Sequence, residues 1–255
     1  MTRIPPEFAS AIGLAGVSLG LLSRAKGARR QGVRQAGTDL SGVVLSTRYL
    51  WEHDRRLSCL ASAEKMLLAS DHADDEADYG PGAWMVKVSG LDKDFEPIDE
   101  LVPLRSSPTP TKYKYARMLR MRIVTAGKIG TNRGTVTATA ADKSVQCAIA
   151  PGFGVSESNH YTIPAGKRGI LLQVDCNAAS AGLITFRGRA RSAEPDAALY
   201  GLYCAHLDTQ VTNTLPLVQP LAEPLSERTD LWLSVSTDSE TGRASSRAYM
   251  LLADA

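Results

Sequence analysis

The chain has 255 residues, of which 44% are hydrophobic and 22% charged, so it is long enough to bury a core as one large domain or two small ones. Its net charge of +2 excludes a chain that is polycationic throughout. The charge is uneven, because residues 1–37 carry six Lys and Arg side chains against one Glu, which leaves the remainder mildly acidic.

The first 40 residues are predicted to form an N-terminal arm, extended or partly helical, that becomes ordered on a neighbouring subunit. The apolar run Phe8–Leu22 is shorter than the ~20 residues of a membrane span, and the positive charge follows it instead of preceding it as in an export signal. We therefore expect no membrane partner. The basic side chains of the arm are candidate partner contacts: Arg24, Lys26, Arg29, Arg30 and Arg34.

Patterns typical of short strands begin near residue 43 and continue to the C-terminus. Buried and exposed positions alternate, with Thr on one face and small apolar residues on the other over 135–140. Two hairpins are predicted, across 177–182 and across 238–244. Three prolines in 215–224 exclude a central strand there and favour an extended crossing loop.

About nine or ten strands with almost no helical period predict an all-β protein, a jelly-roll-like antiparallel β-sandwich with an extended N-terminal arm. In this interpretation residues 1–40 are the arm and residues 41–192 the body of the sandwich. Residues 193–255 add strands that complete the sandwich or form a small second β subdomain.

The chemistry-bearing residues do not form a catalytic motif. The four histidines lie in neither a nucleophile elbow nor a His-Glu-x-x-His pattern, and Gly166-Lys167 lacks the remainder of a phosphate loop. The one tidy trio of carboxylates, Asp92, Asp94 and Glu96, falls in a turn. The sequence therefore predicts no enzyme and no cofactor.

Four widely spaced cysteines, without a Cys-x-x-Cys pair, indicate thiols in a reducing cytoplasm and not a zinc site: Cys59, Cys147, Cys176 and Cys204. The acidic run at 71–78, with Asp74, Asp75 and Glu76, is predicted to be a solvated loop. Two alternatives remain open for this run. Its oxygens could bind Ca²⁺, or it could meet the basic arm of a neighbour.

Two strands are predicted to carry arginines on one face, and these are candidate partner surfaces: Arg117, Arg120 and Arg122 on one, Arg187, Arg189 and Arg191 on the other. They could line a trimer axis, pair with acidic loops, or be exposed salt-bridged faces. Nucleic-acid recognition is not favoured, because no stacking aromatics are interleaved with them.

Several short motifs follow one another over roughly residues 64–190: Ser70–Asp78, Gly80–Ala83, Gly90–Asp92, Glu100–Leu104, Ala126–Gly134 and Tyr161–Lys167. In this order they resemble a family of virion structural proteins of tailed bacteriophages that is common in marine phages. The resemblance implies a non-enzymatic β-sandwich built into a phage particle as a symmetric oligomer. It carries no catalytic residue over to this chain. Pro103, Arg105–Ser107 and the N-terminal arm depart from the family pattern.

The first hypothesis is therefore a virion component, assembled in the host cytoplasm, that decorates the capsid or joins head and tail. Its partners would be copies of itself, as a trimer or hexamer, and other virion proteins. The alternative is a receptor- or carbohydrate-binding module of a tail fibre, which an exposed Trp232 or a cluster of Tyr would favour.

Overall fold

The computed structural model describes residues 29–39, 47–49, 59–158, 160–180, 184–192, 202–203, 209–211, 217–237 and 242–255. Outside residues 59–158, several strands are described by their backbone alone. Every regular element among these residues is a strand, and every strand pairing is antiparallel, so the predicted all-β class is confirmed. In this part of the chain no helix is long and apolar enough to cross a membrane.

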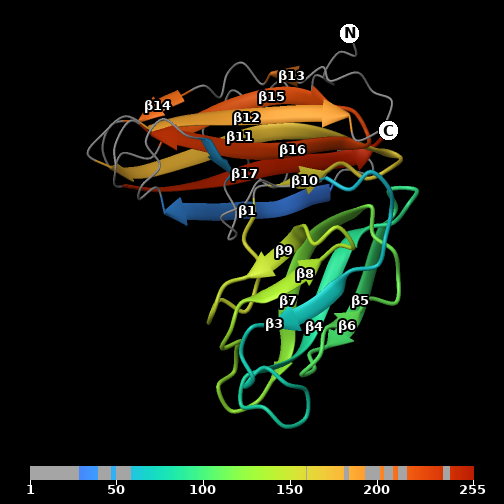
Figure 1. Ribbon diagram of the computed structural model, residues 1–255. Coiled ribbons are helices and arrows are strands. Elements are labelled where there is room, and N and C mark those ends of the chain that lie inside the picture. Colours follow the sequence, from blue (N-terminus) through green and yellow to red (C-terminus); the bar gives the residue numbers. More distant parts are fainter. Residues whose placement is uncertain are drawn as a thin grey trace. The chain divides into compact units, whose positions relative to one another are not determined.

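The chain divides into two compact units, one inserted in the other (Figure 1). The first unit comprises residues 1–50 and 159–255, and the second unit comprises Trp51–Ser158. This division differs from the predicted one, in which the body ended at residue 192. The reason is that strands from both ends of the chain pair with each other in the first unit, which a pattern of hydrophobicity does not reveal.

The first unit holds two sheets. The four-stranded sheet has the order β1 (Arg29–Asp39), β17 (Gly242–Asp254), β11 (Lys167–Ser180) and β15 (Leu217–Leu225). The other has the order β10 (Tyr161–Thr162), β16 (Thr229–Thr237), β12 (Ile184–Ser192) and β13 (Leu202–Tyr203), with β14 (Thr209–Val211) beside β12 and β2 (Thr47–Tyr49) beside β16.

These pairings correct three predictions. The expected arm over residues 1–40 includes β1, which pairs with β17 of the same chain from Arg29↔Leu252 to Asp39↔Arg243. Neither predicted hairpin forms, because β11 and β12 lie in different sheets, as do β16 and β17. The proline-rich segment is not a loop but β15, at the end of its sheet, where a missing N–H on one side does no harm.

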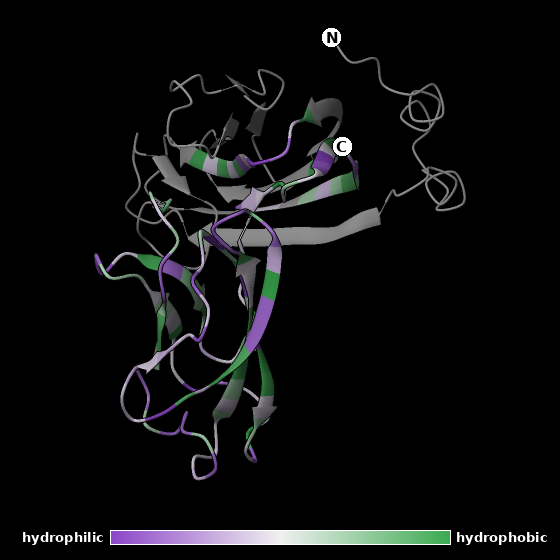
Figure 2. Ribbon diagram, turned by 90° about the vertical axis from the view of Figure 1, so that its right-hand side faces the viewer, coloured by the Kyte–Doolittle hydropathy of each residue, from purple (hydrophilic) through white to green (hydrophobic). Residues whose placement is uncertain are grey.

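The second unit is a sandwich of two small sheets. One has the order β6 (Thr109–Pro110), β3 (Leu67–Ser70), β8 (Val136–Thr139) and β9 (Val145–Ile149), and the other β5 (Pro97–Pro103), β4 (Ala83–Leu91) and β7 (Arg117–Ala126). Hydrophobic and hydrophilic residues alternate along several of these strands (Figure 2). In β8 the small apolar side chains of Val136 and Ala138 are buried while the threonines are half-buried, as predicted.

Apolar side chains from both sheets form the core of the second unit. Leu68 of one sheet, Met66 just before it, and Val86, Val88 and Met121 of the other sheet are all fully buried. Because successive strand residues point to opposite faces, the residues between them face outward.

Candidate functional site

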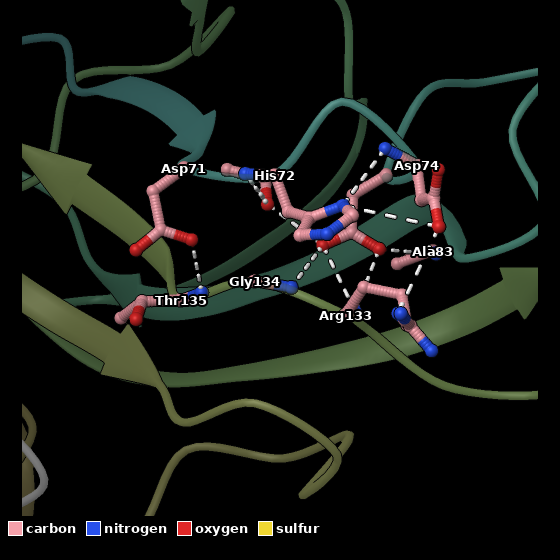
Figure 3. A network of polar contacts seen from close by, with 9 residues as sticks. Asp71, His72, Asp74, Ala83, Arg133, Gly134 and Thr135 are labelled. Atoms are coloured by element: carbon pink, nitrogen blue, oxygen red, sulfur yellow. Dashed lines mark hydrogen bonds and ion pairs between the residues drawn. The ribbon is translucent and has the colours of Figure 1, made fainter.

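Three loops of the second unit meet in what we call the loop junction: residues 70–83, 126–135 and 150–154. At its centre lies Asp75, which is 2% exposed. Its Oδ1 accepts hydrogen bonds from the main-chain nitrogens of Ala83 and Arg133, both at 2.8 Å. Its Oδ2 accepts from Ser70 Oγ at 2.7 Å and from the nitrogen of Gly134 at 2.8 Å (Figure 3). Four donors thus satisfy the buried carboxylate.

Glycines allow the main chain to come this close to Asp75. A Cβ at Gly82 would lie 2.1 Å from Asp75 Oδ1, and a Cβ at Gly134 would lie 2.2 Å from Asp71 Oδ1. Neither glycine has a left-handed backbone, so space and not conformation requires them. Close packing therefore explains why glycine stands at these two positions, in the motifs Gly80–Ala83 and Ala126–Gly134.

Asn132 connects the third loop to the junction. It is 1% exposed, and its Nδ2 donates to the carbonyls of Gly134 at 2.7 Å and Ala150 at 2.8 Å. Its Oδ1 accepts from the nitrogen of Gly154 at 3.0 Å. One side chain thus ties two loops, which explains an Asn in the middle of the Gly-rich motif.

Main-chain hydrogen bonds complete the junction. Gly127 N donates to Gly82 O at 2.7 Å, and Ile129 N donates to Pro81 O at 2.9 Å. Thr135 N donates to Asp71 Oδ1 at 2.7 Å (Figure 3). Segments that lie far apart in the chain are thereby joined by hydrogen bonds. The motifs themselves can be read in the sequence, but their meeting in space cannot.

The acidic candidates Asp74, Asp75 and Glu76 have different surroundings. The prediction of a solvated carboxylate is wrong for Asp75, which is buried. It is not available as a surface contact either, because its oxygens accept hydrogen bonds from main-chain donors inside the junction. Asp74 is half-buried, with its Oδ2 3.7 Å from Arg133 Nε and 3.9 Å from His72 Nδ1. Glu76 is half-buried as well. The Ca²⁺ alternative loses Asp75 as a ligand, because both its oxygens already accept two donors.

The arginine candidates of β7 lie where they were predicted. Arg120 and Arg122 are exposed and flank the buried Met121. Arg117 does not continue this face: it is 4% exposed and donates to the carbonyls of Leu60 at 3.0 Å and Ala116 at 2.7 Å. The register shift between Ser89 and Gly90 of β4 breaks the alternation there.

The remaining basic candidates are placed by their backbone or not at all. Arg187 and Arg189 lie in β12, opposite Ser234 and Trp232 of β16. Arg29, Arg30 and Arg34 lie in β1, along β17. Arg24 and Lys26 lie outside the described residues.

The motif Tyr161–Lys167 forms a turn. Gly166 has a φ of +64°, and Lys167 N donates to Pro164 O at 3.3 Å. Gly166 N donates to Glu227 Oε2 at 2.5 Å, and Lys167 Nζ pairs with Asp254. The side chain of Lys167 therefore connects the start of β11 to the end of β17.

Tyr115 provides a test of the packing between the sheets of the second unit. It is fully buried, and its hydroxyl donates to Glu100 Oε1 at 2.8 Å, which also accepts from Tyr113 N at 3.4 Å. Burial, together with the hydrogen bond to Glu100, raises the pKa of Tyr115 well above its ordinary value near 10.

The raised pKa predicts an alkaline loss of stability. Above about pH 10 the unfolded chain releases the Tyr115 proton while the folded unit keeps it, so the free energy of unfolding falls, by up to about 1.4 kcal/mol per pH unit. Tyr115→Phe removes this component, so its stability should fall less between pH 9 and 11.5 in urea titrations. Equal alkaline losses in both proteins would contradict the assignment.

No protein-family model matches the sequence, and no curated protein matches it. Among solved structures, the chain is similar to the structure of infectious bursal disease virus Gt strain, with 9% identity over 89% of this chain and 73% of that chain, at a TM-score of 0.26. It is similar also to a crystal structure of the IBDV viral particle, with 6% identity over 91% of this chain and 71% of that chain, at a TM-score of 0.27. Both likenesses are too weak to support an argument about fold or function.

Proposed function

We propose that the protein is a non-enzymatic structural component of a tailed-phage virion that acts through contacts between subunits. One observation supports the proposal: the residues in the motifs that resemble phage virion proteins have structural roles. Asp75, Asn132 and Gly82 build the loop junction, and Gly166 forms the turn at β11. A resemblance made of such residues points to a shared scaffold that presents surfaces to partners.

The edge strand β5 of the second unit is protected against unspecific pairing with strands of other molecules. β5 lies at the edge of its sheet, and prolines stand at both of its ends, Pro97 and Pro103. Proline removes hydrogen-bond donors from an edge and thereby limits pairing with strands of other molecules. In the proposed role, subunits meet through side-chain surfaces instead, in capsid decoration or at a joint between head and tail.

The mass of the purified protein tests this proposal. We expect light scattering to give one defined oligomer, a trimer or hexamer, for the full-length chain. A truncation that starts at Arg29 retains β1, whereas one that starts at Gly42 would remove this strand from the sheet. If residues 1–28 link neighbouring subunits, the oligomer of the protein truncated to Arg29 should dissociate at a higher protein concentration than the oligomer of the full-length chain. A full-length protein that stays monomeric up to millimolar concentration would contradict the proposal.

Exposed aromatic side chains favour a second candidate, the receptor- or carbohydrate-binding module. Tyr79 is 84% exposed and Phe153 is 58% exposed, both on loops of the junction. Trp232, which the sequence offered as a platform, is half-buried. Binding of a glycan array by the wild-type protein, lost in Tyr79→Ser, would favour this candidate over a purely structural role.

A further inference from the structure

Basic side chains lie close together on one face of a sheet of the second unit. We call it the outer face: the outward side chains of β5, β4 and β7. Arg122 lies opposite Lys87 of β4, which lies opposite Leu101 of β5. In the next outward row Arg120 lies opposite Ser89, which lies opposite Asp99. The inward rows between them hold buried Val86, Val88 and Met121, so the core fixes the spacing of these outward residues.

The two arginines of the outer face are unsatisfied within the described chain. Lys87 Nζ lies 2.7 Å from Asp99 Oδ2, and this pair is neutral. Arg120 and Arg122 are exposed, and within the part of the chain that the structure describes neither has a hydrogen-bond or ion-pair partner for its side chain. Beside them Leu101 is 59% exposed. Such a surface complements a partner that combines carboxylates with an apolar side chain.

The acidic loop, which we define as residues 71–79, has this combination. Its exposed or half-buried carboxylates are those of Asp71, Asp74, Glu76 and Asp78, and it ends in Tyr79, the most exposed large hydrophobic residue among those the structure describes. Arg133 and Arg105 offset part of the charge at 3.7 Å from Asp74 and Asp78. Hydrogen bonds from Gly82 N to Asp74 O and from Gly80 N to Glu76 O, with the buried Asp75, hold the loop in one conformation, which lowers the entropy lost on binding.

We propose that the acidic loop of one copy binds the outer face of a second copy. The carboxylates meet Arg120 and Arg122, and Tyr79 packs on Leu101. The two surfaces differ, so the contact is heterologous and closes into a ring when the rotation between copies allows it. This inference rests on the proposed function and names the surfaces through which the subunits would assemble.

Charge-reversal variants of the full-length protein test the contact. The face variant is Arg120→Glu with Arg122→Glu. The loop variant is Glu76→Lys, Asp78→Asn and Tyr79→Ser; Asn is chosen because Asp78 has a φ of 74°, a conformation that Asn tolerates. The matched control is Lys65→Glu with Lys114→Glu, two exposed lysines outside both surfaces that give the same change in net charge as the face variant.

Sedimentation equilibrium at low salt should show that each variant assembles about 30-fold more weakly than the wild type, whereas the control assembles normally. The decisive sample is an equimolar mixture of the two variants. The face variant keeps an intact loop and the loop variant keeps an intact face, so the mixture should form heterodimers and nothing larger. High salt should dissociate these heterodimers because the contact is charged.

The outcomes separate this inference from the proposed function. If the wild type assembles and the face variant assembles equally well, or if the mixture stays monomeric, the loop-to-face contact is wrong while a structural role remains. If the wild type does not assemble at all, both are wrong. Circular dichroism of each variant checks that the exposed substitutions leave the sheets folded.

Discussion

Replacing Asp75 with Ala should destabilise the second unit by about 4 kcal/mol. The substitution removes the acceptor of three main-chain donors, at Ala83, Arg133 and Gly134, and of the Ser70 hydroxyl. A buried donor left without an acceptor costs about 1–3 kcal/mol, and four donors share this one carboxylate. This is a large part of the stability of a domain of this size.

Hydrogen exchange followed by mass spectrometry across a urea series measures this loss in each unit separately. The amides of residues 83–88 and 131–139 should lose protection in Asp75→Ala, while those of β11 and β17 should not. Asp74→Ala is the matched control: its side chain is half-buried and pairs with Arg133 at 3.7 Å at the surface, so the substitution should cost less than about 1 kcal/mol. Equal effects of the two substitutions would show that the junction does not depend on Asp75.

Replacing Gly82 with Ala should cost about 2–3 kcal/mol, because the junction has no space for a methyl group. The new Cβ would lie 2.1 Å from Asp75 Oδ1 and 2.9 Å from Asp74 O. The loop cannot move aside freely, because Gly82 N donates to Asp74 O at 2.9 Å and Gly82 O accepts from Gly127 N at 2.7 Å. Overpacking of this kind typically costs about 1–3 kcal/mol.

Gly152→Ala is the control for a glycine that backbone conformation alone requires. Gly152 has a φ of +79°, and no other atom lies within 4 Å of the place that an alanine methyl group would take, so Ala should cost about 1 kcal/mol there. A double-mutant cycle sharpens the test. In the Asp75→Ala background the carboxylate is gone, so Gly82→Ala should cost at least about 1 kcal/mol less than in the wild type. Strict additivity would contradict the contact.

The class of fold and several of its details follow from local patterns in the sequence. Alternation of apolar and polar residues predicted several strands of the second unit, such as the one over 135–140, because side chains of a strand point alternately to the two faces. The exposed Arg120 and Arg122 beside buried Met121 follow from this rule. The turn at Gly166 follows from the local conformational preferences of Pro and Gly.

Pairing between distant strands was decided only by the tertiary structure. β17 pairs with both β1 and β11, and no local pattern distinguishes this from the hairpins that sequence analysis predicted. For the same reason the inserted second unit and the strand within the expected arm were missed. Hydrophobic period determines which face of a strand is buried, but partner and register depend on contacts far apart in the chain.

The loop junction shows the same limit at the level of single residues. The motifs that contribute Asp75, Gly82 and Asn132 could be read in the sequence. That Asp75 is buried while Asp74 is not depends on donors at Arg133 and Gly134, 58 and 59 residues further along the chain. Local sequence therefore determined which segments turn, and long-range hydrogen bonding decided which carboxylate is buried among the turns and which remain at the surface.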